Sequence, residues 1–169
     1  MDILLATHDK NEFFMGTVYE VARLSKDPRT KIGAVLVKNN NIISVGYNNF
    51  PSKVLDLESR YNTKEIKYQF IVHAELNSIL NAAKQGIHTN NSILFTQGIP
   101  CNECAKAIIQ GGIRQVVVHY QWPNLIHSPK WVQSIETSKI MFEESKVDIV
   151  WFNLNLGIKG FLDGKFIDV

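Results

Sequence analysis

Residues 92–119 read SILFTQGIPCNECAKAIIQGGIRQVVVH, and this stretch decides the fold of the chain. The runs 92–96 and 115–119 are short and rich in β-branched or aromatic side chains, as expected of buried strands. Between them, residues 101–110 predict a helix that ends at Gly111-Gly112. A helix between two apolar strands is the unit that joins neighbouring parallel strands.

The flanking segments extend this pattern in both directions. A helix over 130–145 and a strand over 147–152 complete a β-α-β-α-β order, which is typical of parallel strands with helical crossovers. Upstream, the sequence predicts helices over 11–25, within 57–69 and over 73–84, and an antiparallel hairpin of strands 33–37 and 42–46. Residues 1–10 suggest a loosely structured lead-in and residues 154–169 an irregular tail, so we expect one catalytic domain over 11–153.

Composition excludes several classes of protein. The 169 residues are 45% hydrophobic and 20% charged, which is ordinary for a globular domain, and the net charge is only +2. Because the basic residues are scattered, we expect a small substrate and no long nucleic acid. We expect no signal peptide and no membrane association, because the N-terminus lacks a basic n-region and no apolar run approaches the roughly 20 residues of a membrane span. Two cysteines in one motif favour a reducing, cytoplasmic location.

Three side chains are candidate metal ligands: His73, Cys101 and Cys104. The cysteines are spaced i, i+3, so both sulfurs share one face of the first turn of a helix that Pro100 introduces. One imidazole and two thiolates leave the fourth corner of a zinc tetrahedron for water, as in catalytic zinc sites. The H-x-E…P-C-x-x-C arrangement is the signature of zinc deaminases that act on cytosine or adenine.

Glu75, two residues after His73, is the candidate general acid–base. Zinc-activated water is expected to attack C4 of a cytosine ring. Glu75 would take the proton of the water, pass it to N3 and assist the departure of ammonia.

Two other interpretations of the motif are open. C-x-x-C alone is compatible with a redox pair or with a structural zinc site that recruits His119 and His127. The spacing of these histidines exceeds that of zinc fingers, and Glu75 has no purpose in a structural site. We therefore expect histidines 8, 88, 119 and 127 to be surface or loop residues, and the three tryptophans to lie in the core or an interface.

Four segments carry a more specific resemblance. They read SKDPRTKIGAV over 25–35, GYNNFP over 46–51, HAELNSIL over 73–80 and PCNECAKAIIQGGI over 100–113. The zinc motif alone indicates the cytidine deaminase superfamily. With the S-K-D-P and G-Y-N segments the chain resembles deoxycytidylate (dCMP) deaminases, in register over about residues 11–153.

The resemblance implies a three-layer α/β/α domain around a mixed five-stranded sheet, and deamination of dCMP to dUMP for thymidylate synthesis. It implies activation by dCTP, inhibition by dTTP, Mg²⁺ with a bound regulatory triphosphate, and a homo-oligomer, with a hexamer as the expected form. By matching position, Asn48 would hold the deoxyribose hydroxyl, the backbone of Ala74 the base carbonyl, and Arg29 the phosphate.

The chain also departs from the family pattern. Asn49 and Gln97 stand where a Gly and a Thr are usual, and residues 52–70 contain no Cys or His for a second zinc, so we expect one zinc per chain. Rival functions are deamination of another cytosine nucleoside or nucleotide (dCTP included), deamination of a tRNA adenosine, and a non-catalytic zinc-folded scaffold.

Overall fold

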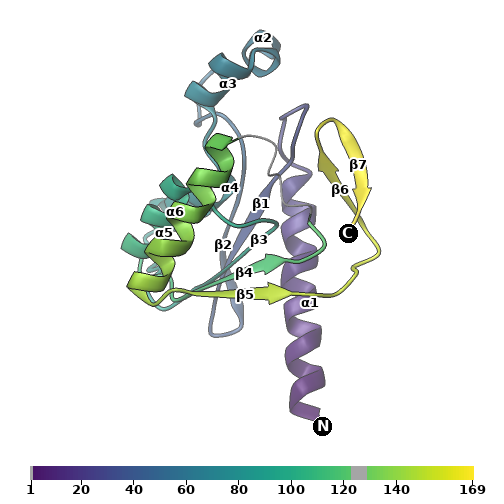
Figure 1. Cartoon of the computed structure of the whole chain (residues 1–169), viewed down its shortest axis with the longest axis vertical. Helices are drawn as coiled ribbons and strands as arrows, with labels where there is room; N and C mark the ends of the chain where they lie inside the picture. Colours follow the sequence, from purple (N-terminus) through teal and green to yellow (C-terminus); the bar gives the residue numbers. More distant parts are fainter. Residues whose placement is uncertain (1, 123–128) are drawn as a thin grey trace.

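A mixed sheet of five strands forms the centre of the molecule (Figure 1). The computed structural model describes residues 2–122 and 129–169, and side chains over 10–122 and 131–169. The strand order is β2-β1-β3-β4-β5, in which β1 pairs antiparallel with β2 and β3, while β3, β4 and β5 are parallel. The strands are β1 (Gly33–Lys38), β2 (Asn41–Tyr47), β3 (Ile93–Thr96), β4 (Gln115–His119) and β5 (Asp148–Phe152).

Helices cover both faces of this sheet and make three layers. One face packs against α1 (Asp2–Ala22), and the other against α4 (Ala74–Lys84), α5 (Asn102–Gln110) and α6 (Pro129–Ser145). Strand alternation produces two cores, since Val35 and Val37 face α1 whereas Ala34 and Leu36 face the opposite helices. The predicted α/β/α architecture and mixed sheet are confirmed.

Two short helices, α2 (Glu58–Asn62) and α3 (Lys64–Phe70), lie between β2 and α4 at one end of the sheet. They match the helical structure expected within 57–69. The predicted hairpin of β1 and β2 is confirmed by its antiparallel register.

The predictions for the two ends of the chain are wrong. Residues 2–10 belong to α1 rather than to a loose lead-in; this stretch has no Pro or Gly and contains good helix formers. In the tail, β6 (Lys159–Leu162) and β7 (Lys165–Asp168) pair as an antiparallel hairpin. The division of the chain at residues 10 and 153 stays a prediction.

His119, expected at the surface, is 1% exposed at the end of β4. Its Nε2 donates to the carbonyl of Leu154 (2.8 Å), and its Nδ1 accepts from the hydroxyl of Tyr19 (2.7 Å). A carbonyl can only accept, so this pair of partners fixes the neutral tautomer. Burial lowers the pKa of His119. His127 lies outside the described residues.

Gly46 of β2 lies against the first turns of α4. A Cβ at this position would lie 2.3 Å from both the carbonyl oxygen of Ala74 and the amide nitrogen of Ser78. The hydroxyl of Ser44 donates to the carbonyl of Ser78 (2.7 Å), and the amide of Asn77 donates to the carbonyl of Tyr47 (2.8 Å). Helix α4 therefore rests directly on the backbone of β2.

Candidate active site

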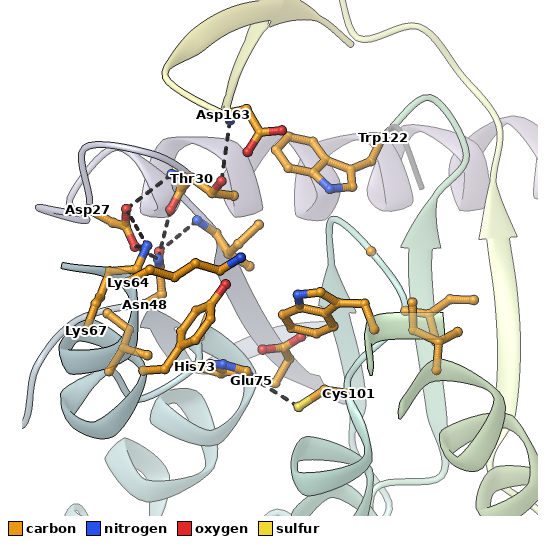
Figure 2. Close-up of a pocket in the computed structure, with 18 residues that line it drawn as sticks. Asp27, Thr30, Asn48, Lys64, Lys67, His73, Glu75, Cys101, Trp122 and Asp163 are labelled. Atoms are coloured by element: carbon orange, nitrogen blue, oxygen red, sulfur yellow. Dashed lines mark hydrogen bonds and ion pairs between the residues drawn. The ribbon is translucent and has the colours of Figure 1, made fainter. Parts of the chain in front are cut away.

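A cavity of about 330 Å³ opens beside the starts of α4 and α5 (Figure 2). We call His73, Glu75 and Cys101, together with the adjacent Cys104, which does not itself line the cavity, its floor. We call Asp27, Lys64, Lys67 and Asp163 its mouth. Apolar and aromatic side chains connect the two, among them Tyr68, Ile99, Trp122, Trp131 and Ile135.

The three predicted ligands converge although they come from two helices. His73 is the N-cap of α4 and Cys101 the N-cap of α5, both with extended backbone, and Cys104 lies in the first turn of α5. Nδ1 of His73 lies 3.3 Å from Sγ of Cys101 and 3.5 Å from Sγ of Cys104. All three donor atoms lie within 4.8 Å of one another, and no other such group of His, Cys, Asp or Glu occurs among the described residues.

These distances fit a zinc ion. With Zn–N near 2.0 Å and Zn–S near 2.3 Å, a tetrahedral ion separates its nitrogen and sulfur ligands by about 3.6 Å. Thiolate and imidazole donors are also the set that zinc prefers. The residues present therefore fit Zn²⁺ held by His73, Cys101 and Cys104.

The pKa of Cys101 depends on both Cys104 and His73, and the pKa of each of these two depends on Cys101. A hydrogen bond from Cys104 lowers the pKa of Cys101, and the same contact together with burial raises the pKa of Cys104. Burial alone would lower the pKa of His73, but the hydrogen bond and charge of Cys101 outweigh it and raise that pKa. A metal ion must displace the proton that the thiol pair retains.

Glu75 lies in the first turn of α4, with its carboxylate buried in the floor. Its Oε2 is 3.7 Å from Sγ of Cys104. Burial raises the pKa of Glu75, and the negative charge of Cys101 acts in the same direction. A carboxyl with a raised pKa, next to a zinc ligand set, is suited both to accept and to donate a proton.

Trp122 and Trp131 line the cavity, and Trp122 also belongs to the core, as the sequence suggested. The ring of Trp131 on α6 stacks on His73, with centroids 6.1 Å apart and an interplanar angle of 22°. Ser134, one turn further along α6, accepts a hydrogen bond from the backbone N–H of Asn102 and donates to its side chain. This contact fixes α6 beside the start of α5, so the aromatic wall and the ligands keep their relative positions.

Asn48 lines the cavity, but its side chain already makes three hydrogen bonds within the protein. Its Oδ1 accepts from the N–H of Ile32 (2.8 Å), and its Nδ2 donates to the carbonyl of Thr30 (2.8 Å) and to Asp27 (3.4 Å). One lone pair of Oδ1 remains for a sugar hydroxyl. Contact between Asn48 and the sugar stays a prediction.

Ala74 and Arg29, the other two predicted binding residues, differ in position. Ala74 is buried in the cavity wall at the first position of α4, where a backbone N–H has no acceptor within its own helix. Arg29 is exposed and is not among the residues that line the cavity. Both proposed contacts, to the base carbonyl and to the phosphate, stay predictions.

The mouth was missed by the sequence reasoning. Lys67 on α3 forms a buried ion pair with Asp27 (2.9 Å), although 40 residues separate them. Asp163 comes from the turn between β6 and β7. The D-G dipeptide 163–164 between two apolar runs was a usable signal for that turn; nothing local indicated the ion pair.

The fold and the ligand set define a zinc-dependent deaminase of the cytidine deaminase class. Residues 8–120 match the family model described as "Cytidine and deoxycytidylate deaminase zinc-binding region". The chain belongs to this family, as the sequence motifs predicted.

Two relatives illustrate the range of the family. The chain is 36% identical over 136 residues to the "uncharacterized deaminase in luxG 3'region" of Aliivibrio fischeri, covering 80% of this chain and 88% of that protein. It is 38% identical over 112 residues to the human deoxycytidylate deaminase, covering 63% of this chain and 62% of the human protein.

Solved structures show the same fold. The apo dCMP deaminase of cyanophage S-TIM5 superposes with a TM-score of 0.64 at 24% identity, covering 83% of this chain and 95% of that one. The complex of that enzyme with dCMP and dUMP gives 0.58 at 25% identity, covering 89% and 97%. In the described part of the chain, no helix is long and apolar enough to cross a membrane.

Proposed function

We propose that this chain deaminates dCMP to dUMP and ammonia, and so supplies dUMP for thymidylate synthesis. The observation that carries the proposal is the floor itself, where a buried carboxylate adjoins three zinc-type donors. Similarity to deoxycytidylate deaminases, one with a structure that contains dCMP and dUMP, supports the choice of substrate.

The residues of the floor suit hydrolysis of the amidine at C4. Bound zinc would supply a nucleophile by lowering the pKa of a water molecule to about 7. Glu75 takes a proton from the attacking water and delivers it to N3, and then gives a proton to the leaving amine. One C–N bond breaks and one C–O bond forms, so water and dCMP yield dUMP and ammonia without a redox partner.

The remaining contacts belong to the same proposal. The N–H of Ala74 donates to the base carbonyl, Asn48 contacts the sugar, and Trp131 beside His73 forms an apolar wall for the ring. Arg29, the phosphate ligand that the family resemblance implies, is not among the residues that line the cavity.

We also propose a cytoplasmic homo-oligomer, with a hexamer as the expected form, activated by dCTP and inhibited by dTTP. Both cysteines are free thiols, which suits a reducing compartment. Mg²⁺ would bind only together with a regulatory triphosphate. The described residues contain no second cluster of three or more His, Cys, Asp or Glu side chains that could hold a metal ion. Light scattering with and without the triphosphates tests the assembly.

The decisive experiment is an assay of the zinc-loaded protein with dCMP, deoxycytidine, cytosine, dCTP and a tRNA. Loss of cytosine absorbance with dCMP, at a higher kcat/KM than with the others, supports the proposal; protein treated with a chelator is the control. Preference for another cytosine compound would replace dCMP by that substrate. Absence of turnover with every compound would favour a scaffold.

A further inference from the structure

The mouth of the cavity holds four charged side chains, two of which neutralise each other. Lys67 and Asp27 form an ion pair whose side chains are 10% and 3% exposed. Asp27 also accepts the backbone N–H groups of Arg29 (2.8 Å) and Thr30 (3.3 Å), so its carboxylate is committed to the loop. Lys64 and Asp163 remain as the charges that a ligand can meet.

Lys64 reaches the cavity from α3. Its Nζ lies 5.7 Å from the ring centroid of Tyr68, another lining residue, and no carboxylate among the described residues pairs with it. In the view of Figure 2, its ammonium lies between the floor and Asp163. Lys64 therefore places a cation between the floor and the turn that carries Asp163.

Asp163 is held at the mouth by its backbone. Asp163 and Gly164 both have positive φ (49° and 77°), as in a type I′ turn. The N–H of Gly164 donates to the carbonyl of Arg29 (2.7 Å), and the N–H of Asp163 donates to the hydroxyl of Thr30 (3.4 Å). The turn is thereby attached to the S-K-D-P loop, and the carboxylate makes no ion pair within the described residues.

We propose that Lys64 binds the 5′-phosphate of the nucleotide and that Asp163 limits the site to a single phosphate. This inference rests on the proposed function, since the floor must hold C4 of the base and the phosphate must then point towards the mouth. A monophosphate carries about −1.5 to −2 charges and pairs with one ammonium. A second phosphate would extend past Lys64 and meet the like charge of Asp163.

The test compares deoxycytidine, dCMP and dCDP as substrates of the zinc-loaded protein and five variants. Lys64→Gln should raise KM for dCMP about tenfold while changing that for deoxycytidine less than about twofold. Asp163→Asn should raise the ratio of kcat/KM for dCDP over dCMP about tenfold. Asn followed by Gly also forms type I′ turns, so this change keeps the hairpin.

Matched controls remove the same charges elsewhere. Lys84→Gln acts on the exposed end of α4, and Asp168→Asn on the same hairpin as Asp163; neither residue lines the cavity. Both should leave all three substrates unchanged. The proposal is overturned if Lys64→Gln weakens deoxycytidine as much as dCMP, or if Asp163→Asn leaves the dCDP to dCMP ratio unchanged. It also fails if Arg29→Gln, rather than Lys64→Gln, produces the loss with dCMP.

Ligand binding separates this inference from the proposed function. Quenching of the fluorescence of the cavity tryptophans gives affinities for the same three compounds without any turnover. If wild-type protein binds but does not deaminate dCMP, the proposed function fails, and the order of affinities in the variants still decides the roles of Lys64 and Asp163.

Discussion

The floor of the cavity is made by two helix starts that carry their ligands within a few residues, whereas its mouth is assembled from three separate segments. His73 and Glu75 lie at the N-cap and in the first turn of α4, and Cys101 and Cys104 lie at the N-cap and in the first turn of α5. The mouth combines the S-K-D-P loop, α3 and the β6–β7 turn, and one of its contacts joins residues 133 positions apart. The floor is therefore a local unit of two helix starts, whereas the mouth depends on contacts between distant segments. In our proposal the floor carries the reaction and the mouth selects the substrate.

The largest expected effect separates the two regions most directly. Glu75→Gln should lower kcat by about 10²–10⁴-fold, because it removes the group that moves protons, while zinc content stays the same. Steady-state kinetics and metal analysis measure both quantities. Glu103→Gln, on the exposed first turn of α5, is the matched control. Substantial turnover by zinc-loaded Glu75→Gln would contradict the assignment of the floor.

The stability of the mouth depends on its buried ion pair. Lys67→Met leaves the carboxylate of Asp27 buried without its partner and should lower the free energy of unfolding by about 3–5 kcal/mol. Urea denaturation measures this loss, and Lys84→Met at an exposed site should change stability by less than about 0.5 kcal/mol.

The double variant Lys67→Met/Asp27→Asn sharpens this result. It removes both charges and should recover part of the lost stability, since the unpaired charge is gone. If Lys67→Met were as stable as Lys84→Met, the pair would not hold the mouth together.

The floor should bind zinc in a way that depends on pH. Because the pKa of Cys104 is raised beside Cys101, zinc must release at least one proton on binding. Its affinity should fall about tenfold per pH unit on acidification for each proton released. Competition with a chelator at pH 8 and pH 6 measures this, and removal of zinc should lower the melting temperature. Affinity that does not change with pH would argue against this ligand set.

The smallest expected effect concerns the buried His119, which is not among the residues that line the cavity. Burial lowers the pKa of His119, so the unfolded chain binds a proton more readily than the folded one. The stabilisation is complete above the unfolded pKa near 6.5 and is lost as the pH falls through the folded pKa. Melting temperatures from pH 7.5 to 5 should fall more steeply for wild type than for His119→Gln. Equal slopes would show that the buried imidazole contributes nothing.

The difference between floor and mouth also explains what the sequence could predict. The i, i+3 spacing of Cys101 and Cys104, with Pro100 before them, fixes their geometry locally, and helical periodicity locates His73 at a helix start. These predictions need no knowledge of tertiary structure. The match between Lys67 and Asp27 depends on how a loop and a short helix pack, which no local pattern encodes.

Two predictions from the sequence were wrong for other reasons. The hairpin of β6 and β7 was missed although the Asp163-Gly164 dipeptide is a strong turn signal, because the flanking strands have only four residues each. His119 was expected at the surface because an isolated histidine carries no periodic signal. Its burial depends on Tyr19 and Leu154, two partners that lie far from it in the sequence.

The contact at Gly46 has a consequence for how variation in this chain would be interpreted. Even a methyl group there would push against the backbone of Ala74 and Ser78, and α4 would have to shift along with the imidazole and the carboxylate that it carries. Such a variant could remain folded and still show no activity in a screen. A residue with no side chain, outside every reactive group, would then be scored as essential for catalysis, although what it contributes is clearance.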